Sequence, residues 1–190
     1  MDVCVLMGSP RKNGNTAELA KPFLEELRSG GAEVTYLELV DLDIAPCKGC
    51  YHCQDVQEGY GCIQKDDMQR VADAILKCDL IVLATPIYTW YCTAEMKAML
   101  DRFYAFGKFY RSASGNLLEN KRICVLATHG YDAAYAADPF VIGIQRMCEH
   151  YSMRYNGMYS VRDIDDLASF QTKQAVAGAR DFARYLLSIE

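Results

Sequence analysis

Short apolar runs alternate with amphipathic segments along this chain, and that alternation restricts its fold more than any other feature. Residues 80–84 are apolar throughout, which is typical of a strand covered on both faces. Residues 94–103 instead carry a helical apolar face, made by Met96, Met99, Leu100 and Phe103. We expect strands at 3–7, 34–39, 80–84, 123–127 and 156–161, and helices at 16–28, 68–76, 94–103, through Val141, Ile144 and Cys148, and at 166–187.

Five such strand–helix units predict an α/β fold with a doubly wound parallel sheet. Right-handed crossovers place helices on both sheet faces, which gives a three-layer sandwich with the flavodoxin-like strand order 2-1-3-4-5. The length of 190 residues, of which 51% are apolar, fits one domain over 1–190. Residues 41–65 fit no strand–helix unit, so we expect an insertion there. Ligands should bind beyond the carboxyl ends of the first, third and fourth strands.

Composition argues against several kinds of partner. The net charge is −5 and the Lys and Arg residues are scattered, so nothing favours nucleic-acid binding. The apolar stretch at 1–7 is too short to span a membrane and lacks the basic start of a signal peptide. We therefore expect a cytoplasmic protein without a membrane partner, in a compartment that keeps its nine cysteines reduced. Five isolated cysteines are interpreted as small buried hydrophobic residues: Cys4, Cys78, Cys92, Cys124 and Cys148.

The loop after the first strand, residues 8–16, has the composition of a phosphate-binding loop. Its small residues let the backbone approach an anion, and the following helix offers unpaired N–H groups. Neutral and charged donors come from Ser9, Arg11, Asn15 and Thr16. The loop matches neither the P-loop nor the dinucleotide spacing, which favours a single phosphate. An alternative is that Asn15 only caps the helix, with Glu18 completing a capping box, and the two roles are compatible.

Two further loops offer groups for a flat ligand. Residues 85–93 contain Tyr88, Trp90 and Tyr91, whose rings could hold a conjugated ring system or pack against a neighbouring subunit. Residues 128–131 end the fourth strand and could contact the same ring. His129 in that loop could equally be an ordinary loop histidine.

A run of closely spaced cysteines lies within the expected insertion. Its members are Cys47, Cys50, Cys53 and Cys62. The C-x2-C-x2-C spacing brings three thiols within reach of one metal centre, and a fourth can complete the shell. The residues leave three readings open: a [4Fe-4S] cluster, a structural zinc ion, or thiols that are free or linked by disulfides. His52 lies inside the run and should point away from such a centre.

Three motifs together resemble one known family. They are Gly8-Ser9-Pro10-Arg11 with Gly14-Asn15-Thr16, then Pro46-Cys47-Lys48-Gly49-Cys50 with Cys53, Cys62 and Asp66-Asp67-Met68, and finally Thr85-Pro86-Ile87-Tyr88 with Lys97 and Asp101-Arg102. With these motifs the chain resembles the flavodoxin-like NAD(P)H-dependent FMN reductases and, among them, the iron-sulfur flavoproteins. The likeness is close over about the first hundred residues and holds for the rest only at the level of the fold.

The resemblance implies non-covalently bound FMN and a set of residues around it. The phosphate would be held by Ser9, Arg11, Asn13, Asn15 and Thr16. The isoalloxazine ring would lie against Pro86, Ile87, Tyr88, Thr89 and Trp90, with its pyrimidine edge at Thr128, His129 and Gly130. A [4Fe-4S] cluster would be ligated by Cys47, Cys50, Cys53 and Cys62. Eight residues separate Cys53 from Cys62, slightly more than is usual in the family.

The implied function is electron transfer from a nicotinamide, NADH or NADPH, through FMN. The acceptor would be a small quinone-like or flavin molecule, or a redox protein reached through the cluster. No catalytic side chain is expected. The alternatives are a non-enzymatic FMN electron carrier and a flavin-free binding domain. A homodimer or homotetramer is also expected, because the segment with Trp90, Tyr104, Phe106, Phe109 and Tyr110 offers much apolar surface.

Overall fold

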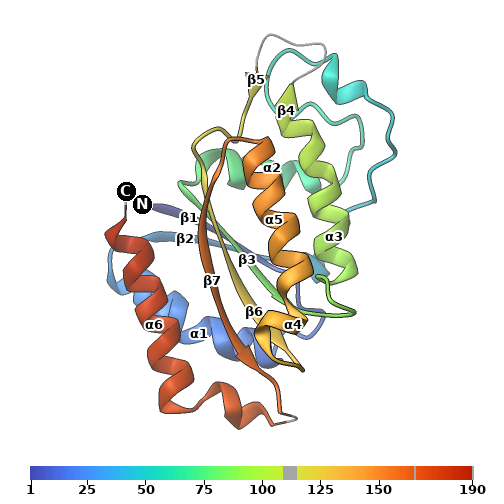
Figure 1. The fold of residues 1–190 in the computed structure, drawn as a ribbon. Helices are drawn as coiled ribbons and strands as arrows, with labels where there is room; N and C mark the ends of the chain where they lie inside the picture. Colours follow the sequence, from blue (N-terminus) through green and yellow to red (C-terminus); the bar gives the residue numbers. More distant parts are fainter. Residues whose placement is uncertain (109–114, 165, 190) are drawn as a thin grey trace.

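Five parallel strands form the centre of the molecule in a computed structural model that describes residues 1–108, 115–164 and 166–189. The sheet order is β2-β1-β3-β6-β7 (Figure 1). The strands are β1 (Asp2–Met7), β2 (Glu33–Glu38), β3 (Leu80–Pro86), β6 (Arg122–His129) and β7 (Arg154–Arg162). Because β4 (Gly107–Lys108) and β5 (Gly115–Asn116) form a separate antiparallel ribbon, this is the predicted order 2-1-3-4-5.

Helices cover both faces of the sheet, as predicted. One layer contains α1 (Asn15–Ser29) and α6 (Lys173–Ser188), and the other α2 (Met68–Lys77), α3 (Ala94–Asp101) and α5 (Asp138–His150). Two separate cores result: Leu19 and Phe23 pack with one face of β1 and β3, and Val71 and Met99 pack with the other. Every residue of β3 and β6 is buried, which explains their continuous apolar runs.

Three local predictions are wrong or need correction. The last helix begins at Lys173 rather than 166, because Thr172 caps it and a short 3-10 turn, Leu167–Phe170, precedes it. The helix predicted at 94–103 ends at Asp101 and continues as 3-10 turns over Arg102–Phe106. The capping box is absent, since Gly14 is the N-cap of α1 and the Glu18 carboxylate pairs with Lys21.

The segment between the 3-10 turn Leu39–Asp41 and α2 contains one other short 3-10 turn, His52–Gln54. Two hydrogen bonds tie its two ends together: the Asp43 N–H donates to the Asp67 carboxylate at 2.8 Å, and the Asp67 N–H donates to the Asp43 carbonyl at 3.0 Å. The segment runs along α3 toward the β4–β5 ribbon, at the end of the molecule away from the carboxyl ends of β6 and β7 (Figure 1). This placement separates the cysteines from the loops at the carboxyl edge.

Aromatic residues predicted to form an exposed surface are partly buried within the chain. Phe106 is buried and packs against Phe103 and Tyr60, and Tyr104 is half-buried. Phe109 and Tyr110 lie outside the described residues. Among the described residues, every helix falls short of the length and apolarity that a membrane span requires.

Candidate functional site

The loop after β1 is a tight turn closed by its own polar groups. The Arg11 N–H donates to Ser9 Oγ at 3.2 Å, and the Ser9 hydroxyl lies 3.1 Å from the Arg11 carbonyl as a donor. The Gly14 N–H also donates to the Arg11 carbonyl, at 3.1 Å. The turn leads directly into α1, whose first N–H groups lack helical acceptors, as at the start of any helix. The loop therefore has the form of an anion site at a helix N-terminus.

Gly8 allows this loop to lie against the start of α3. A Cβ atom at position 8 would stand 2.9 Å from Met96 Cε and 3.0 Å from Met96 Cβ, which is too close. The Thr93 hydroxyl donates to the Gly8 carbonyl at 2.6 Å. Its Oγ1 also accepts from the Met96 N–H and so caps α3. The first loop and the loop before α3 are thus fixed to each other.

The side chains of the first loop differ in their partners. Arg11 is exposed and forms no ion pair among the residues described, so its charge is available to an anion. Lys12 instead pairs with Asp41 at 2.6 Å. The Asn15 side-chain amide donates to the Asp163 carboxylate, which the sequence did not indicate because 148 positions separate the two.

A cavity of about 510 Å³ lies beside this loop. It is lined by Arg11, Asn13, Gly14, Asn15, Asp163, Asp166 and Leu167. Four of the lining residues come from the first loop and three from the segment after β7. Asp163 and Asp166 of that second segment place negative charge next to the anion site. Their charge opposes the binding of an anion there.

Three loops meet where β1, β3 and β6 end: the first loop (8–16), the second loop (85–93) and the third loop (128–131). The hydroxyls of Thr16 and Thr128 are 2.9 Å apart and both residues are buried. The Ile87 N–H donates to the Thr128 carbonyl at 2.7 Å. Since β1 and β3 are neighbours from which the chain winds in opposite directions, this is the switch point of the sheet, where ligands of such folds bind.

The second loop contains a two-residue turn with strained backbone. Tyr88 and Tyr91 exchange backbone hydrogen bonds of 2.8 and 2.9 Å. Between them, Thr89 and Trp90 have φ angles of 49° and 63°, the left-handed region that non-glycine residues seldom adopt. Strain of this kind is concentrated at functional sites.

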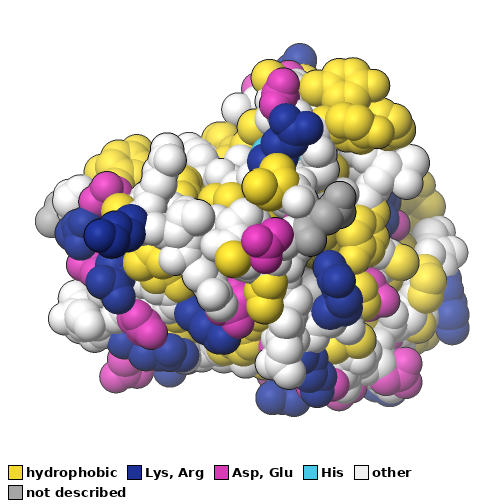
Figure 2. Space-filling view, turned by 90° about the horizontal axis from the view of Figure 1, so that it is seen from below, with side chains coloured by type: hydrophobic (Ala, Val, Ile, Leu, Met, Phe, Trp, Pro, Cys, Tyr) yellow, Lys and Arg dark blue, Asp and Glu magenta, His cyan; other side chains and the backbone are white. Residues whose placement is uncertain are grey.

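Exposed aromatic rings surround a second cavity at this edge. Trp90 stacks on Tyr131 with ring centroids 6.4 Å apart and an interplanar angle of 4°, and Tyr135 meets both rings edge-on. The cavity has a volume of about 200 Å³ and is lined by Ile87, Thr89, Trp90, Gly130, Tyr131 and Ala136. Seen from this side, hydrophobic side chains reach the surface between charged ones (Figure 2). Tyr135 lies outside the three loops for which the sequence predicts ligand contacts.

Several predicted ring contacts have buried side chains. Pro86 and Thr128 are buried strand residues, and the Thr128 hydroxyl is engaged with Thr16. His129 is also buried: its Nδ1 lies 2.7 Å from the Tyr131 carbonyl and its Nε2 lies 3.0 Å from Ser160 Oγ. These residues can meet a bound ring mainly through their backbone.

The four clustered cysteines line one cavity of about 380 Å³ beside the end of α3. Cys47 and Cys50 are exposed, Cys53 is buried and Cys62 is half-buried, and all four are free thiols. Burial raises the pKa of Cys53, and the nearby Cys62 and Cys50 thiols add to this rise. Over the described ranges, no three His, Cys, Asp or Glu side chains already stand in a metal-binding arrangement. The five other cysteines are buried, as predicted.

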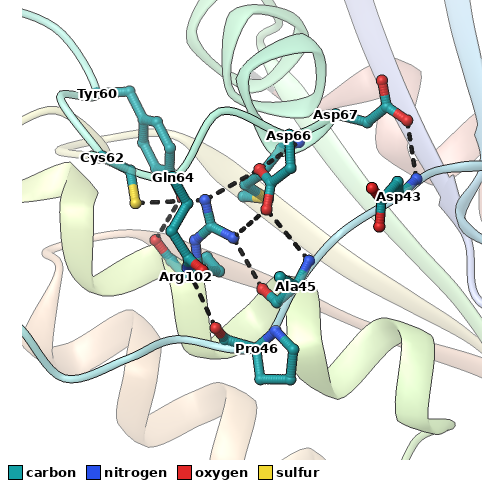
Figure 3. Close-up of polar contacts among 10 residues, drawn as sticks. Asp43, Ala45, Pro46, Tyr60, Cys62, Gln64, Asp66, Asp67 and Arg102 are labelled. Carbon is teal, nitrogen blue, oxygen red and sulfur yellow. Dashed lines mark hydrogen bonds and ion pairs between the residues drawn. The ribbon is translucent and has the colours of Figure 1, made fainter.

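A buried ion pair anchors the cysteine segment to the end of α3 (Figure 3). Arg102 donates to both oxygens of Asp66, at 2.7 and 3.1 Å, and to the Ala45 carbonyl at 2.8 Å. Its Nη2 also donates to Cys62 Sγ at 3.3 Å. Tyr60 completes the contact by donating its hydroxyl to the Arg102 carbonyl at 3.0 Å.

Two more buried polar side chains hold the cysteine segment around Cys53 in place. Gln54 donates to the carbonyls of Tyr104, at 3.2 Å, and Gly107, at 2.6 Å. The Lys108 ammonium donates to the carbonyls of Cys53, at 2.7 Å, and Tyr60, at 3.0 Å. Neither role was visible in the sequence, because Gln and Lys in irregular segments are ordinarily exposed.

Comparison with known proteins agrees with these features. Residues 1–140 match the NADPH-dependent FMN reductase family. The chain belongs to that family. An iron-sulfur flavoprotein from Archaeoglobus fulgidus is 35% identical over 102 residues, which cover 54% of this chain and 45% of the relative. An iron-sulfur flavoprotein from Methanosarcina thermophila is 31% identical over 102 residues, covering 54% and 52%. The chain spans about half the length of these relatives.

Two solved structures share the fold of the whole chain. An NAD(P)H:quinone oxidoreductase from Methanothermobacter marburgensis has a TM-score of 0.74 at 18% identity, covering 100% of this chain and 98% of that one. The azoreductase AzrA has a TM-score of 0.67 at 13% identity, covering 99% of each. The predicted flavodoxin-like sandwich and the resemblance to this family are both confirmed.

Proposed function

We propose that residues 1–190 form one FMN-binding domain, with a cysteine-rich insertion at about 41–65, that passes electrons from NADH or NADPH to an acceptor. The observation that carries this proposal is the junction of the three loops at the switch point. There the Thr16 and Thr128 hydroxyls meet at 2.9 Å, next to an anion loop on one side and an aromatic cavity on the other. A phosphorylated flat ring matches that combination.

The residues around the two cavities divide into two groups. The phosphate would be held by Ser9, Arg11, Asn13, Asn15 and Thr16, of which only Arg11 brings charge. The ring would be held by Pro86, Ile87, Tyr88, Thr89, Trp90, Thr128, His129 and Gly130. When bound, FMN supplies the ability to accept electrons in a pair and release them singly. The protein positions the ligand and limits its contact with water, and we assign no acid or base side chain.

We further propose a [4Fe-4S] cluster on Cys47, Cys50, Cys53 and Cys62. Their shared cavity supports this, as does the soft thiolate donor set, which suits iron–sulfur clusters. The relatives from Archaeoglobus fulgidus and Methanosarcina thermophila are named for the same pair of cofactors. Closing the ligand shell requires the exposed arm with Cys47 and Cys50 to approach Cys53 and Cys62. Zinc binding, or thiols without metal, are the competing outcomes.

The two sites are separated by the length of α3. Its eight residues span roughly 12 Å. The acceptor would be a small quinone-like or flavin molecule at the aromatic cavity, or a redox protein near the cysteines. We also propose a homodimer or homotetramer, supported by the exposed rings of Trp90, Tyr131 and Tyr135. The nine free thiols support a reducing, cytoplasmic location.

FMN titration of the flavin-free protein tests the proposal, with flavin fluorescence as the readout. The double variant Arg11→Ala, Asn15→Ala should bind FMN about 10- to 100-fold more weakly, because it loses charge-assisted and neutral hydrogen bonds to the phosphate. Lys12→Ala is the matched control, since Lys12 is committed to Asp41 and should matter little. Equal affinity in the double variant and the wild type would refute the assignment.

A further inference from the structure

Lys108 is a buried cation that forms no ion pair with a carboxylate in the described part of the chain. The residue is 1% exposed, and its Nζ donates hydrogen bonds to two main-chain carbonyls, those of Cys53 and Tyr60. Among the described residues no Asp or Glu forms an ion pair with it. A buried charge that is met only by neutral dipoles is costly, and buried charges in proteins are normally paired. The site therefore calls for negative charge close to Lys108.

The thiols of Cys53 and Cys62 are the groups that can provide it. Both belong to stretches that Lys108 holds, because its Nζ donates to the Cys53 carbonyl at 2.7 Å and to the carbonyl of Tyr60, two positions before Cys62, at 3.0 Å. The other buried cation of the site is already neutralised, because Arg102 is bonded to both oxygens of Asp66. Of these two buried cations, Lys108 is the one without a carboxylate partner among the residues that the structure describes.

Lys108 also holds the backbone at Cys53 and close to Cys62. Its ammonium binds the carbonyls of both Cys53 and Tyr60 and so joins the part of the segment around Cys53 to the part around Cys62. Tyr60 is two positions before Cys62. Arg102 also holds the part around Cys62, because its Nη2 donates to Cys62 Sγ. Lys108 thus contacts the backbone of Cys53 and Arg102 contacts the Cys62 thiol, whereas Cys47 and Cys50 are exposed.

We propose that Lys108 is the counter-ion and positioning residue of a metal centre ligated by the four cysteine thiolates. The inference rests on the proposed metal site and extends it to a residue outside the ligand set. A buried ammonium offsets the negative charge of several thiolates around a metal, which strengthens metal binding. It also favours the reduced form of the centre, because reduction adds one more negative charge. Loss of the ammonium should weaken metal binding and lower the reduction potential together.

Three variants of the full FMN-loaded chain separate these effects from simple folding. Lys108→Met keeps the length of the side chain without its charge, and Lys108→Arg keeps the charge. Lys48→Met is the matched control, because Lys48 is a lysine that lines the cysteine cavity but is exposed to water. Each protein is reconstituted anaerobically with ferrous iron and sulfide, then assayed for iron content, for the rate of iron loss to a chelator, and for cluster and FMN midpoint potentials. Cobalt(II) affinity, read from thiolate-to-cobalt absorption, provides a measurement independent of cluster assembly.

The wild type should hold about four irons per chain. Lys108→Met should bind cobalt about 10- to 100-fold more weakly, lose iron faster and show a more negative cluster potential with an unchanged FMN potential. Lys108→Arg should recover most of the potential, and Lys48→Met should match the wild type. Wild-type values in Lys108→Met would overturn the counter-ion role while leaving the cluster intact. Cobalt binding without iron uptake would refute the cluster. In that case weaker cobalt binding by Lys108→Met would support the Lys108 role, and equal cobalt affinities would refute it. Binding of neither metal by the wild type would overturn both.

Discussion

Replacing Asp66 by Asn should release the cysteine segment from the end of α3. The Asp66 carboxylate accepts four hydrogen bonds: two from Arg102, at 2.7 and 3.1 Å, one from the Ala45 N–H at 3.1 Å and one from the Met68 N–H at 3.2 Å. The variant leaves the Arg102 guanidinium buried without a counter-charge, since that side chain is 1% exposed. Removing one partner of a buried ion pair costs about 3–5 kcal/mol. The equilibrium constant for opening the segment should rise roughly 100- to 5,000-fold.

Urea unfolding and the rate of Cys62 alkylation together measure this effect. Asp101→Asn is the control, because the Lys97–Asp101 pair is solvent-exposed and should contribute less than about 0.5 kcal/mol. Adding Arg102→Met to Asp66→Asn should recover part of the loss, since the double variant has no unpaired buried charge. A loss below about 1 kcal/mol in Asp66→Asn, with Cys62 no more reactive than in the wild type, would refute the anchoring role.

The same ion pair predicts a specific response to acid. Burial acts to raise the pKa of Asp66, but the bonds from Arg102 and the Ala45 N–H outweigh it and hold the pKa below its ordinary value. A carboxyl whose pKa is lowered on folding stabilises the native state fully above its unfolded pKa of about 3.9. That contribution disappears as the pH falls through the lower folded value. The acid-induced loss of stability in this range should be smaller in Asp66→Asn.

Three further substitutions test the carboxyl edge. Asp163→Asn removes a negative charge that contacts Asn15 in the proposed phosphate cradle, so FMN affinity relative to riboflavin should rise about fivefold in fluorescence titrations; an unchanged ratio would argue for another phosphate position. Gly8→Ala should cost about 1–3 kcal/mol in thermal unfolding because the new methyl group overlaps Met96, and adding Met96→Ala should relieve that overlap; full stability of the single variant would contradict it. Thr89→Gly should stabilise the fold by about 1 kcal/mol by removing the left-handed strain at φ 49°, and a loss of stability would show that the threonine side chain contributes more than the strain costs.

The arrangement of strands and helices was predictable because burial imposes a visible pattern on the sequence. A strand covered on both faces, such as Leu80–Pro86, must be apolar throughout, and an amphipathic helix such as Met68–Lys77 shows its apolar face at regular spacing. The loops that end β1, β3 and β6 follow from that order, and the structure joins them through Thr16, Ile87 and Thr128. Topology was therefore sufficient to bring these three loops together.

The groups that escaped prediction are polar residues whose burial depends on distant partners. Lys108 and Gln54 are buried only because carbonyls of another segment accept their hydrogen bonds, and no local pattern reveals that. Asp163 reaches the first loop from the far end of the chain. The start of the last helix was misplaced because Thr172 is a capping residue only if the preceding turn ends there. Each case requires tertiary contacts that periodicity does not encode.

Anaerobic visible spectroscopy of the FMN-loaded protein, before and after addition of NADH or NADPH, tests the central claim most directly. We predict that the flavin absorbance bands bleach with the nicotinamide and return when a quinone is added. Failure to bind FMN would contradict the account outright. FMN that binds but is reduced by neither nicotinamide, only by a reduced redox protein, would instead identify an electron carrier and contradict the proposed reductase activity.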